Sequence, residues 1–102
     1  MILQDILYKV SIRSTKGNTN VEISSLVIDS RQATAGSCFI ALRGTKADGQ
    51  AYINSAIDKG AVAIVCESLP DDIKDGIIYI QVEDAAEAAG YMSHNFYGEP
   101  SL

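Results

Sequence analysis

The sequence has few residues of the kinds that build metal sites and membrane anchors. It contains one histidine, two cysteines and no tryptophan among 102 residues. The two cysteines lack a Cys-x-x-Cys spacing, so we expect no metal site. No apolar run approaches the ~20 residues of a membrane-spanning helix, and Asp5 interrupts the opening apolar segment where a signal peptide needs an unbroken core. Cys38 and Cys66 lie inside apolar runs and are expected to be buried thiols. We therefore expect a cytoplasmic, reduced protein without a membrane partner.

Basic residues are also scarce. Lysine and arginine number 8 against 13 aspartate and glutamate residues, which gives a formal net charge of -5. The basic residues do not gather into a patch, and a negatively charged protein repels phosphate backbones and anionic lipid. We therefore expect no nucleic-acid partner.

The motifs that mark common catalytic sites are missing from the chain. There is no Gly-x-x-x-x-Gly-Lys-Ser/Thr, no Gly-x-Gly-x-x-Gly and no nucleophile elbow. Gly44-Thr45-Lys46 lacks the second glycine and the spacing of a phosphate-binding loop. His94, the one candidate base, falls in a predicted helix, where a histidine more often packs or lies at the surface than catalyses. This chain therefore offers no catalytic residues of its own.

Apolar periodicity and turn residues predict one α/β domain over residues 1–102, with a mixed, partly parallel sheet flanked by helices. A strand, a helix and a second strand follow one another between Ser37 and Cys66, and Gly60 stops the helix. Such a unit is a right-handed crossover whose two strands are parallel. The expected elements are a helix over 2–10, a loop over 14–20, a strand ending near Ile28, a strand over 37–42, a helix over 50–59, strands over 61–66 and 77–82, and a helix from a cap at Asp84 to a stop at Gly98.

Two polar clusters follow two successive strands of the predicted sheet. Asp29-Ser30-Arg31 comes after one strand, and Arg43 to Gly49 comes after the next. In open α/β sheets, ligands lie outside the carboxyl ends of the strands. Thr45, Lys46 and Ala47 would offer successive backbone N–H groups to a diphosphate before a helix N-terminus. The Ser30 hydroxyl, which can donate and accept, could read the edge of a base.

A second interpretation of the same residues needs no ligand. Asp29 would start a turn by accepting from the backbone, Arg31 would pair with Asp29, and Asp48-Gly49 would turn the chain into the next helix. Such polar clusters are common in turns, so spacing alone leaves both interpretations open.

Taken as a whole, the chain resembles a known family. The matching segments are Asp29-Ser30-Arg31, Gly36, Phe39 to Gly44, Asp48-Gly49, Ala56-Ile57 and Gly60 to Ala63. Together they closely resemble the N-terminal domain of the Mur ligases, in particular of those that add the third residue to the peptidoglycan stem peptide. Phe96 to Ser101 is similar to the junction at which that family continues into its ATP-binding central domain, so the resemblance covers nearly the full chain.

The resemblance implies a role within a larger enzyme. That enzyme would be a UDP-N-acetylmuramoyl-L-alanyl-D-glutamate:diamino acid ligase, which adds meso-diaminopimelate or L-lysine and hydrolyses ATP to ADP and phosphate. The N-terminal domain would bind the UDP moiety of the UDP-linked muramyl dipeptide, without a cofactor of its own. ATP and magnesium would be bound by the central and C-terminal domains of the same polypeptide, which would lie outside this chain.

The nucleotide-binding positions of the family map onto the two polar clusters. Ile28 and Ser30 match the nucleotide contacts at the end of the first strand. Thr45, Lys46 and Ala47 match those of the second loop. The residues expected to support these contacts are Asp29, Arg31, Gly44, Asp48 and Gly49. The sequence departs from the family at Gln50, where the family often has histidine. Thr45 and Lys46 are variable among relatives, so their backbone groups rather than their side chains are expected to make the contacts.

Two alternatives remain. The ligase that adds the D-alanyl-D-alanine dipeptide shares the Asp-Ser/Thr-Arg pattern, although Asp48-Gly49 and the Tyr97-Gly98-x-Pro100-Ser101 junction favour the tripeptide-forming enzyme. From another class, the chain would be a non-enzymatic α/β interaction module that docks through the exposed face of its last helix, near Tyr91 and Tyr97.

Overall fold

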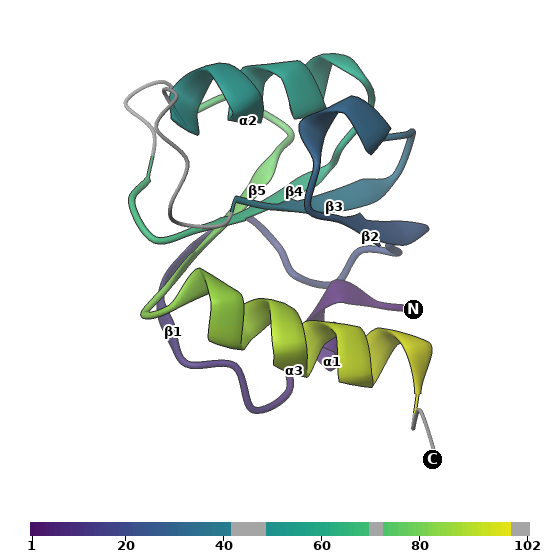
Figure 1. The fold of residues 1–102 in the computed structure, drawn as a ribbon, viewed down its shortest axis with the longest axis vertical. Coiled ribbons are helices and arrows are strands. Elements are labelled where there is room, and N and C mark those ends of the chain that lie inside the picture. Colours follow the sequence, from purple (N-terminus) through teal and green to yellow (C-terminus); the bar gives the residue numbers. More distant parts are fainter. Residues whose placement is uncertain (42–48, 70–72, 99–102) are drawn as a thin grey trace.

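The computed structural model of the chain describes residues 1–41, 49–69 and 73–98. The five strands form one sheet in the order β1-β5-β4-β3-β2. Figure 1 shows α2 and the short 3-10 helix η1 on one face of this sheet, and α1 and α3 on the other. The elements are α1 (Leu3–Ile6), β1 (Ile12–Lys16), β2 (Ser25–Val27), η1 (Ser30–Gln32), β3 (Ser37–Ile40), α2 (Gly49–Asp58), β4 (Ala63–Cys66), β5 (Ile78–Val82) and α3 (Ala85–Tyr97).

The crossover expected between residues 37 and 66 is confirmed. The chain passes from β3 through α2 to β4, and β4 runs parallel to β3 with Cys38 opposite Ala63. Gly60 follows α2 with a φ of +113°, a backbone conformation that favours glycine, so the helix stops there. Strands β2, β3, β4 and β5 run parallel to one another, so their carboxyl ends lie at one edge of the sheet.

One strand is not indicated by the sequence. Residues 14–16 belong to β1, so the loop predicted over 14–20 is wrong for its first part. β1 pairs antiparallel with β5, with Thr15 opposite Ile80, which makes the sheet mixed as expected. It is an edge strand whose residues are mostly exposed, and it therefore lacks the apolar alternation that reveals a half-buried strand.

The first helix is shorter than predicted. The apolar spacing predicts a helix over residues 2–10, but α1 ends at Ile6. Lys9 adopts a φ of +72°, which takes the backbone out of the right-handed helical path. The Val10 N–H instead donates to the carbonyl oxygen of Leu7 in a turn (3.0 Å). Leu3 and Ile6 are fully buried, so the predicted apolar face is confirmed although its length is not.

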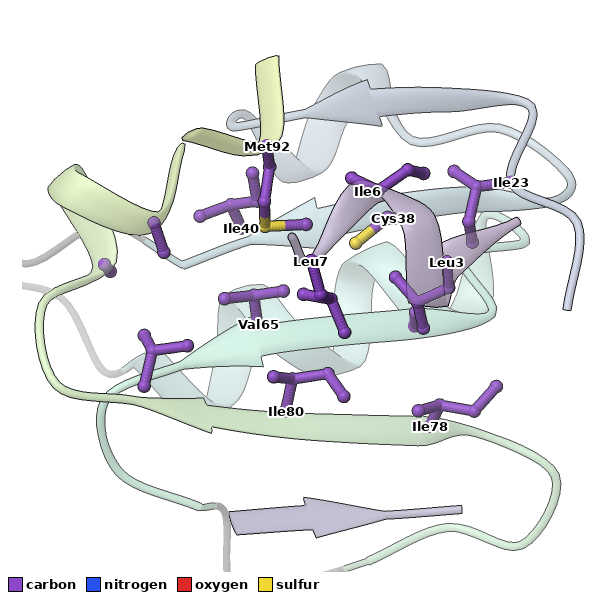
Figure 2. Packing of buried hydrophobic residues seen from close by; sticks show 14 residues of the cluster. Leu3, Ile6, Leu7, Ile23, Cys38, Ile40, Val65, Ile78, Ile80 and Met92 are labelled. Carbon is purple, nitrogen blue, oxygen red and sulfur yellow. The ribbon is translucent and has the colours of Figure 1, made fainter. Parts of the chain in front are cut away.

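The core has two layers, one on each face of the sheet. Alternate residues of a strand point to opposite faces, so Cys38 joins the layer under α1 and α3 while Phe39 joins the layer under α2. Figure 2 shows the first of these layers, where Ile6 of α1 and Met92 of α3 lie over the sheet. The burial on both faces that the apolar run of β3 predicts is confirmed, because every residue of that strand is buried.

Both cysteines are buried free thiols, as predicted. Burial disfavours the charged thiolate and raises the pKa of Cys38 to about 12 and that of Cys66 to about 11. Across residues 1–41, 49–69 and 73–98, no group of three or more His, Cys, Asp or Glu side chains could hold a metal ion. In the same residues, no helix combines the length and the apolar character needed to cross a bilayer.

The last helix begins at the predicted cap. The Asp84 carboxylate accepts hydrogen bonds from the backbone N–H groups of Ala86 (2.9 Å) and Glu87 (3.1 Å). Glu67, just after β4, accepts from the N–H of Ala85 (2.8 Å). Two carboxylates therefore satisfy amides of the first turn of α3, where the helix dipole also favours negative charge.

Candidate functional site

The first polar cluster lies at the carboxyl end of β2, as predicted. β2 ends at Val27, which stands opposite Phe39 of the parallel strand β3, and η1 begins at Ser30. For Gly49, the structure describes only its place at the start of α2. The other residues predicted in the second cluster lie outside the described residues: Arg43, Gly44, Thr45, Lys46, Ala47 and Asp48.

Asp29 and Arg31 form a closed pair at this turn. Oδ1 of Asp29 accepts from the backbone N–H of Arg31 (2.9 Å) and from its Nε (3.1 Å), and Oδ2 accepts from a terminal guanidinium nitrogen (2.8 Å). The hydrogen bonds from the Arg31 side chain and then from its backbone lower the pKa of Asp29 to about 2. The pKa of Arg31 is raised, mainly by the hydrogen bond to Asp29. The hydrogen bonds that the turn interpretation predicts for Asp29 and Arg31 are therefore present.

Ile28 and Ser30 sit on either side of Asp29 in very different environments. The Ile28 side chain is exposed (59%), whereas Ser30 is almost fully buried (4%). In η1, the Ser30 carbonyl accepts from the N–H of Ala33 (3.3 Å). The turn thus presents an apolar side chain to solvent close to a serine that is almost fully buried.

Helix α2 packs on η1 and brings a residue to this turn that the sequence pattern placed elsewhere. The pattern assigns Tyr52 to the apolar face of the helix, but Tyr52 is exposed (40%) whereas Ile53 and Ala56 are buried. Tyr52 lies close enough to Arg31 to make the smallest of the contributions to its pKa. The residue type could have indicated the exposure of Tyr52, because a tyrosine often lies at the margin of an apolar face with its hydroxyl in water.

The lowered pKa of Asp29 predicts a pH dependence of stability in acid. Its ordinary value is 3.8 and its value in the folded protein is about 2, so the ionised pair stabilises the fold above pH ~4 and loses this effect as the pH falls toward ~2. We expect Asp29→Asn to flatten the decline of the thermal unfolding midpoint between pH 4 and pH 2. Arg31→Ala should flatten it to a smaller extent, since it removes the guanidinium but keeps the backbone N–H of residue 31, which also lowers the pKa of Asp29. Wild-type and variant curves that stay parallel across this window would contradict the prediction.

A surface hollow of about 550 Å³ lies on the other face of the sheet. It is lined by Tyr8 and Lys9, which follow α1, and by Glu87, Tyr91 and His94 of α3, among others. Since α1 and α3 cover the face opposite η1 and α2 (Figure 1), the hollow is separate from the Asp29 turn. The exposed surface named by the interaction-module alternative is therefore present around Tyr91, but neither Ile28 nor Ser30 lines it.

A parallel sheet that presents a polar turn at the carboxyl ends of its strands is the architecture of ligand-binding α/β domains. Residues 22–97 match the sequence model of a family described as "Mur ligase family, catalytic domain". The chain belongs to the Mur ligase family. The family predicted from the sequence is thereby confirmed.

Several curated relatives are diaminopimelate ligases by name. The chain is 46% identical over 101 residues to the UDP-N-acetylmuramoyl-L-alanyl-D-glutamate–2,6-diaminopimelate ligase of Bacteroides fragilis. It is 45% identical to the proteins of the same name from Bacteroides thetaiotaomicron, over 101 residues, and Cytophaga hutchinsonii, over 102 residues. Each match covers 99% of this chain and 21% of the relative. The chain thus spans about a fifth of the length of these relatives.

Solved structures with the same fold are more distant in sequence. A crystal structure of MurF from Acinetobacter baumannii matches with a TM-score of 0.71 at 22% identity, over 91% of this chain and 20% of that one. A UDP-N-acetylmuramoylalanyl-D-glutamyl-2,6-diaminopimelate–D-alanyl-D-alanyl ligase from the same organism matches with a TM-score of 0.69, over 87% and 20%. This likeness confirms the predicted α/β fold with a mixed sheet flanked by helices.

Proposed function

We propose that this chain is the N-terminal, UDP-binding domain of a peptidoglycan-precursor ligase. The full-length enzyme would add a diamino acid to UDP-N-acetylmuramoyl-L-alanyl-D-glutamate, with hydrolysis of ATP to ADP and phosphate. The observation that carries the proposal is the 45–46% identity, across 99% of the chain, to ligases named for this substrate. The same names favour 2,6-diaminopimelate over L-lysine as the added residue.

The division of labour within that enzyme is part of the proposal. The matched family model is described as a catalytic domain, yet this sequence has no Gly-x-x-x-x-Gly-Lys-Ser/Thr with which to hold ATP. We assign ATP and magnesium to the other domains of the same polypeptide, which would act in the cytoplasm. This domain would hold one end of the substrate while the reacting carboxylate reaches those domains.

The proposed contacts combine the described turn with the second loop. Ile28, whose side chain is exposed, would lie against the flat base, and Ser30 would hydrogen-bond the edge of the base. The backbone N–H groups of Thr45, Lys46 and Ala47 would bind the diphosphate ahead of α2, where the helix dipole favours negative charge. The proposed supporting residues are Asp29, Arg31, Gly44, Asp48 and Gly49.

Titration of the ¹⁵N-labelled chain with UDP tests the proposal. We expect chemical-shift changes at residues 28–32 and at the start of α2, and Ser30→Ala should weaken UDP binding about fivefold, or ~1 kcal/mol, because one hydrogen bond to the base is lost. Ser93→Ala is the matched control, since Ser93 is an exposed serine of α3 on the opposite face of the sheet, and it should leave the affinity unchanged.

Two outcomes would contradict the proposed function. The first is an absence of any saturable shift in the wild-type chain at high millimolar UDP. The second is a set of shifts confined to the hollow beside α3, which would favour the interaction module.

The coding sequence beyond residue 102 tests the division of labour. A strand followed by Gly-x-x-x-x-Gly-Lys-Thr within a few residues would support the proposed arrangement, whereas an immediate stop codon would overturn it.

A further inference from the structure

Asp29 and Arg31 are bonded to each other across the residue between them. Three hydrogen bonds of 2.8–3.1 Å join the Asp29 carboxylate to the backbone N–H and the guanidinium of Arg31. The hydrogen-bonded ring that they close includes the backbone of Ser30. Two backbone bonds tighten the same turn: the Asp29 carbonyl accepts from Gln32 N–H (2.9 Å), and the Ser30 carbonyl accepts from Ala33 N–H (3.3 Å).

Asp29 and Arg31 differ in burial from Ser30, the residue between them. The side chains of Asp29 and Arg31 are 34% and 84% exposed, whereas Ser30 is buried. A closed ring between residues 29 and 31 restricts the backbone dihedrals of residue 30. It therefore determines the direction in which the Ser30 side chain leaves the backbone.

A contribution to stability does not by itself explain the Asp29–Arg31 pair. An exposed ion pair contributes little net stability, because water screens the charges and because two long side chains lose freedom. Another exposed pair between side chains, Arg13 with Glu83, meets through a single contact of 3.6 Å. By contrast, Arg31 commits both Nε and a terminal nitrogen to one carboxylate, which is the geometry that adds directional specificity.

We propose that Asp29 and Arg31 are positioning residues that hold the Ser30 hydroxyl in place for the base of UDP. This inference rests on the proposed function and adds to it a role for the pair that is distinct from charge. Arg31 would not serve as the cation for the diphosphate, because its guanidinium is already bound to Asp29. The low pKa of Asp29 is consistent with this role, since the pair stays ionised throughout the neutral range.

A double-mutant cycle tests the inference. UDP affinities are measured by the same titration for the wild type, Asp29→Ala, Ser30→Ala and the double variant. If Asp29 acts through Ser30, each single variant should weaken binding about fivefold, and the double variant should also be weaker by about fivefold rather than ~25-fold. Effects that multiply in the double variant, or an unchanged affinity of Asp29→Ala, would overturn the positioning role.

Arg31→Lys separates positioning from charge. Lysine keeps the positive charge but cannot form the two-pronged bond, so positioning predicts that Arg31→Lys weakens binding about as much as Asp29→Ala. If Arg31 instead served the diphosphate directly, Arg31→Lys would retain affinity and Asp29→Ala would increase it by freeing the guanidinium, and either result would overturn the inference. Glu83→Ala, which removes the surface pair between Arg13 and Glu83, is the matched control and should have no effect. A wild-type chain that does not bind UDP would overturn the proposed function, whereas failure of the cycle in a chain that binds UDP would overturn the positioning role alone.

Discussion

Replacing Gly60 with alanine should destabilise the protein by about 3 kcal/mol. An added Cβ would lie 2.7 Å from Cα and 2.8 Å from N of Ala35, and 3.1 Å from the carbonyl carbon of Thr34. These neighbours are backbone atoms, so no side-chain rotation can relieve the contact. The φ of +113° adds the conformational cost of a positive φ for a residue with a side chain, about 1–2 kcal/mol.

The position of Gly60 explains why the effect should be global. Its carbonyl accepts from the N–H of Gly36 (2.9 Å), so the end of α2 lies directly on the segment that enters β3. Moving these segments apart to admit a methyl group would disturb the first strand of the crossover together with its helix. Urea unfolding, followed by far-UV circular dichroism, measures the loss. A domain of this size has a total unfolding free energy of only about 5–15 kcal/mol.

Two other glycines are matched controls for Gly60→Ala. Gly76 also has a positive φ (+84°), but nothing lies within 4 Å of its Cβ position, so Gly76→Ala should show the conformational cost alone, about 1–2 kcal/mol. Gly90 is in the interior of α3, also with nothing within 4 Å, so close packing does not account for it and Gly90→Ala should stabilise by about 1 kcal/mol. If Gly60→Ala loses no more stability than Gly76→Ala, the close approach of Ala35 is not the reason that position 60 requires glycine.

The crossover could be predicted because each part of it has a local signal. Gly60 marks the end of α2, and the apolar run before Cys66 is too short and too β-branched for a second helix. β1 has no such signal. Its stability comes from backbone pairing with β5 at the edge of the sheet, and residues such as Ser14 and Thr15 have the composition of a loop. Strand pairing at an exposed edge depends on a distant partner, which a local pattern does not contain.

The location of the Asp29 turn could also be predicted, but the directions of its side chains could not. Alternation and parallel order place the turn at the carboxyl end of a strand. The sequence assigns Ile28 and Ser30 to the same ligand, but it does not indicate that Ile28 is exposed while Ser30 is almost fully buried. The bonds that η1 makes, and the Asp29–Arg31 pair, set the backbone path and hence which side chain turns inward. Tyr52 approaches Arg31 only because α2 packs on η1, a tertiary contact that no spacing within either segment reveals.

Replacing Tyr79 with alanine should cost about 4 kcal/mol, the largest effect that we expect from a single side chain. Among the described residues, Tyr79 has the largest of the fully buried side chains, and it belongs to the layer under α2. Removing its ring loses the transfer free energy of the buried atoms and leaves a cavity, and Phe or Trp to Ala changes in cores cost 3–5 kcal/mol. Such a loss would remove a large share of the total stability. The urea midpoint measures it directly.

The ring and the hydroxyl of Tyr79 can be separated experimentally. The hydroxyl oxygen accepts from the N–H of Lys74 (3.1 Å), so Tyr79→Phe keeps the packing and should cost only about 1 kcal/mol for the hydrogen bond. Tyr91→Ala changes the same residue type at an exposed position of α3 and should fall within ~0.5 kcal/mol of the wild type. If Tyr79→Phe loses nearly as much stability as Tyr79→Ala, the hydrogen bond between the Tyr79 hydroxyl and Lys74 contributes more than burial of the ring. Because β5 bridges the parallel strands and the edge strand β1, that result would also predict that β1 loses amide-exchange protection before β3 and β4 do.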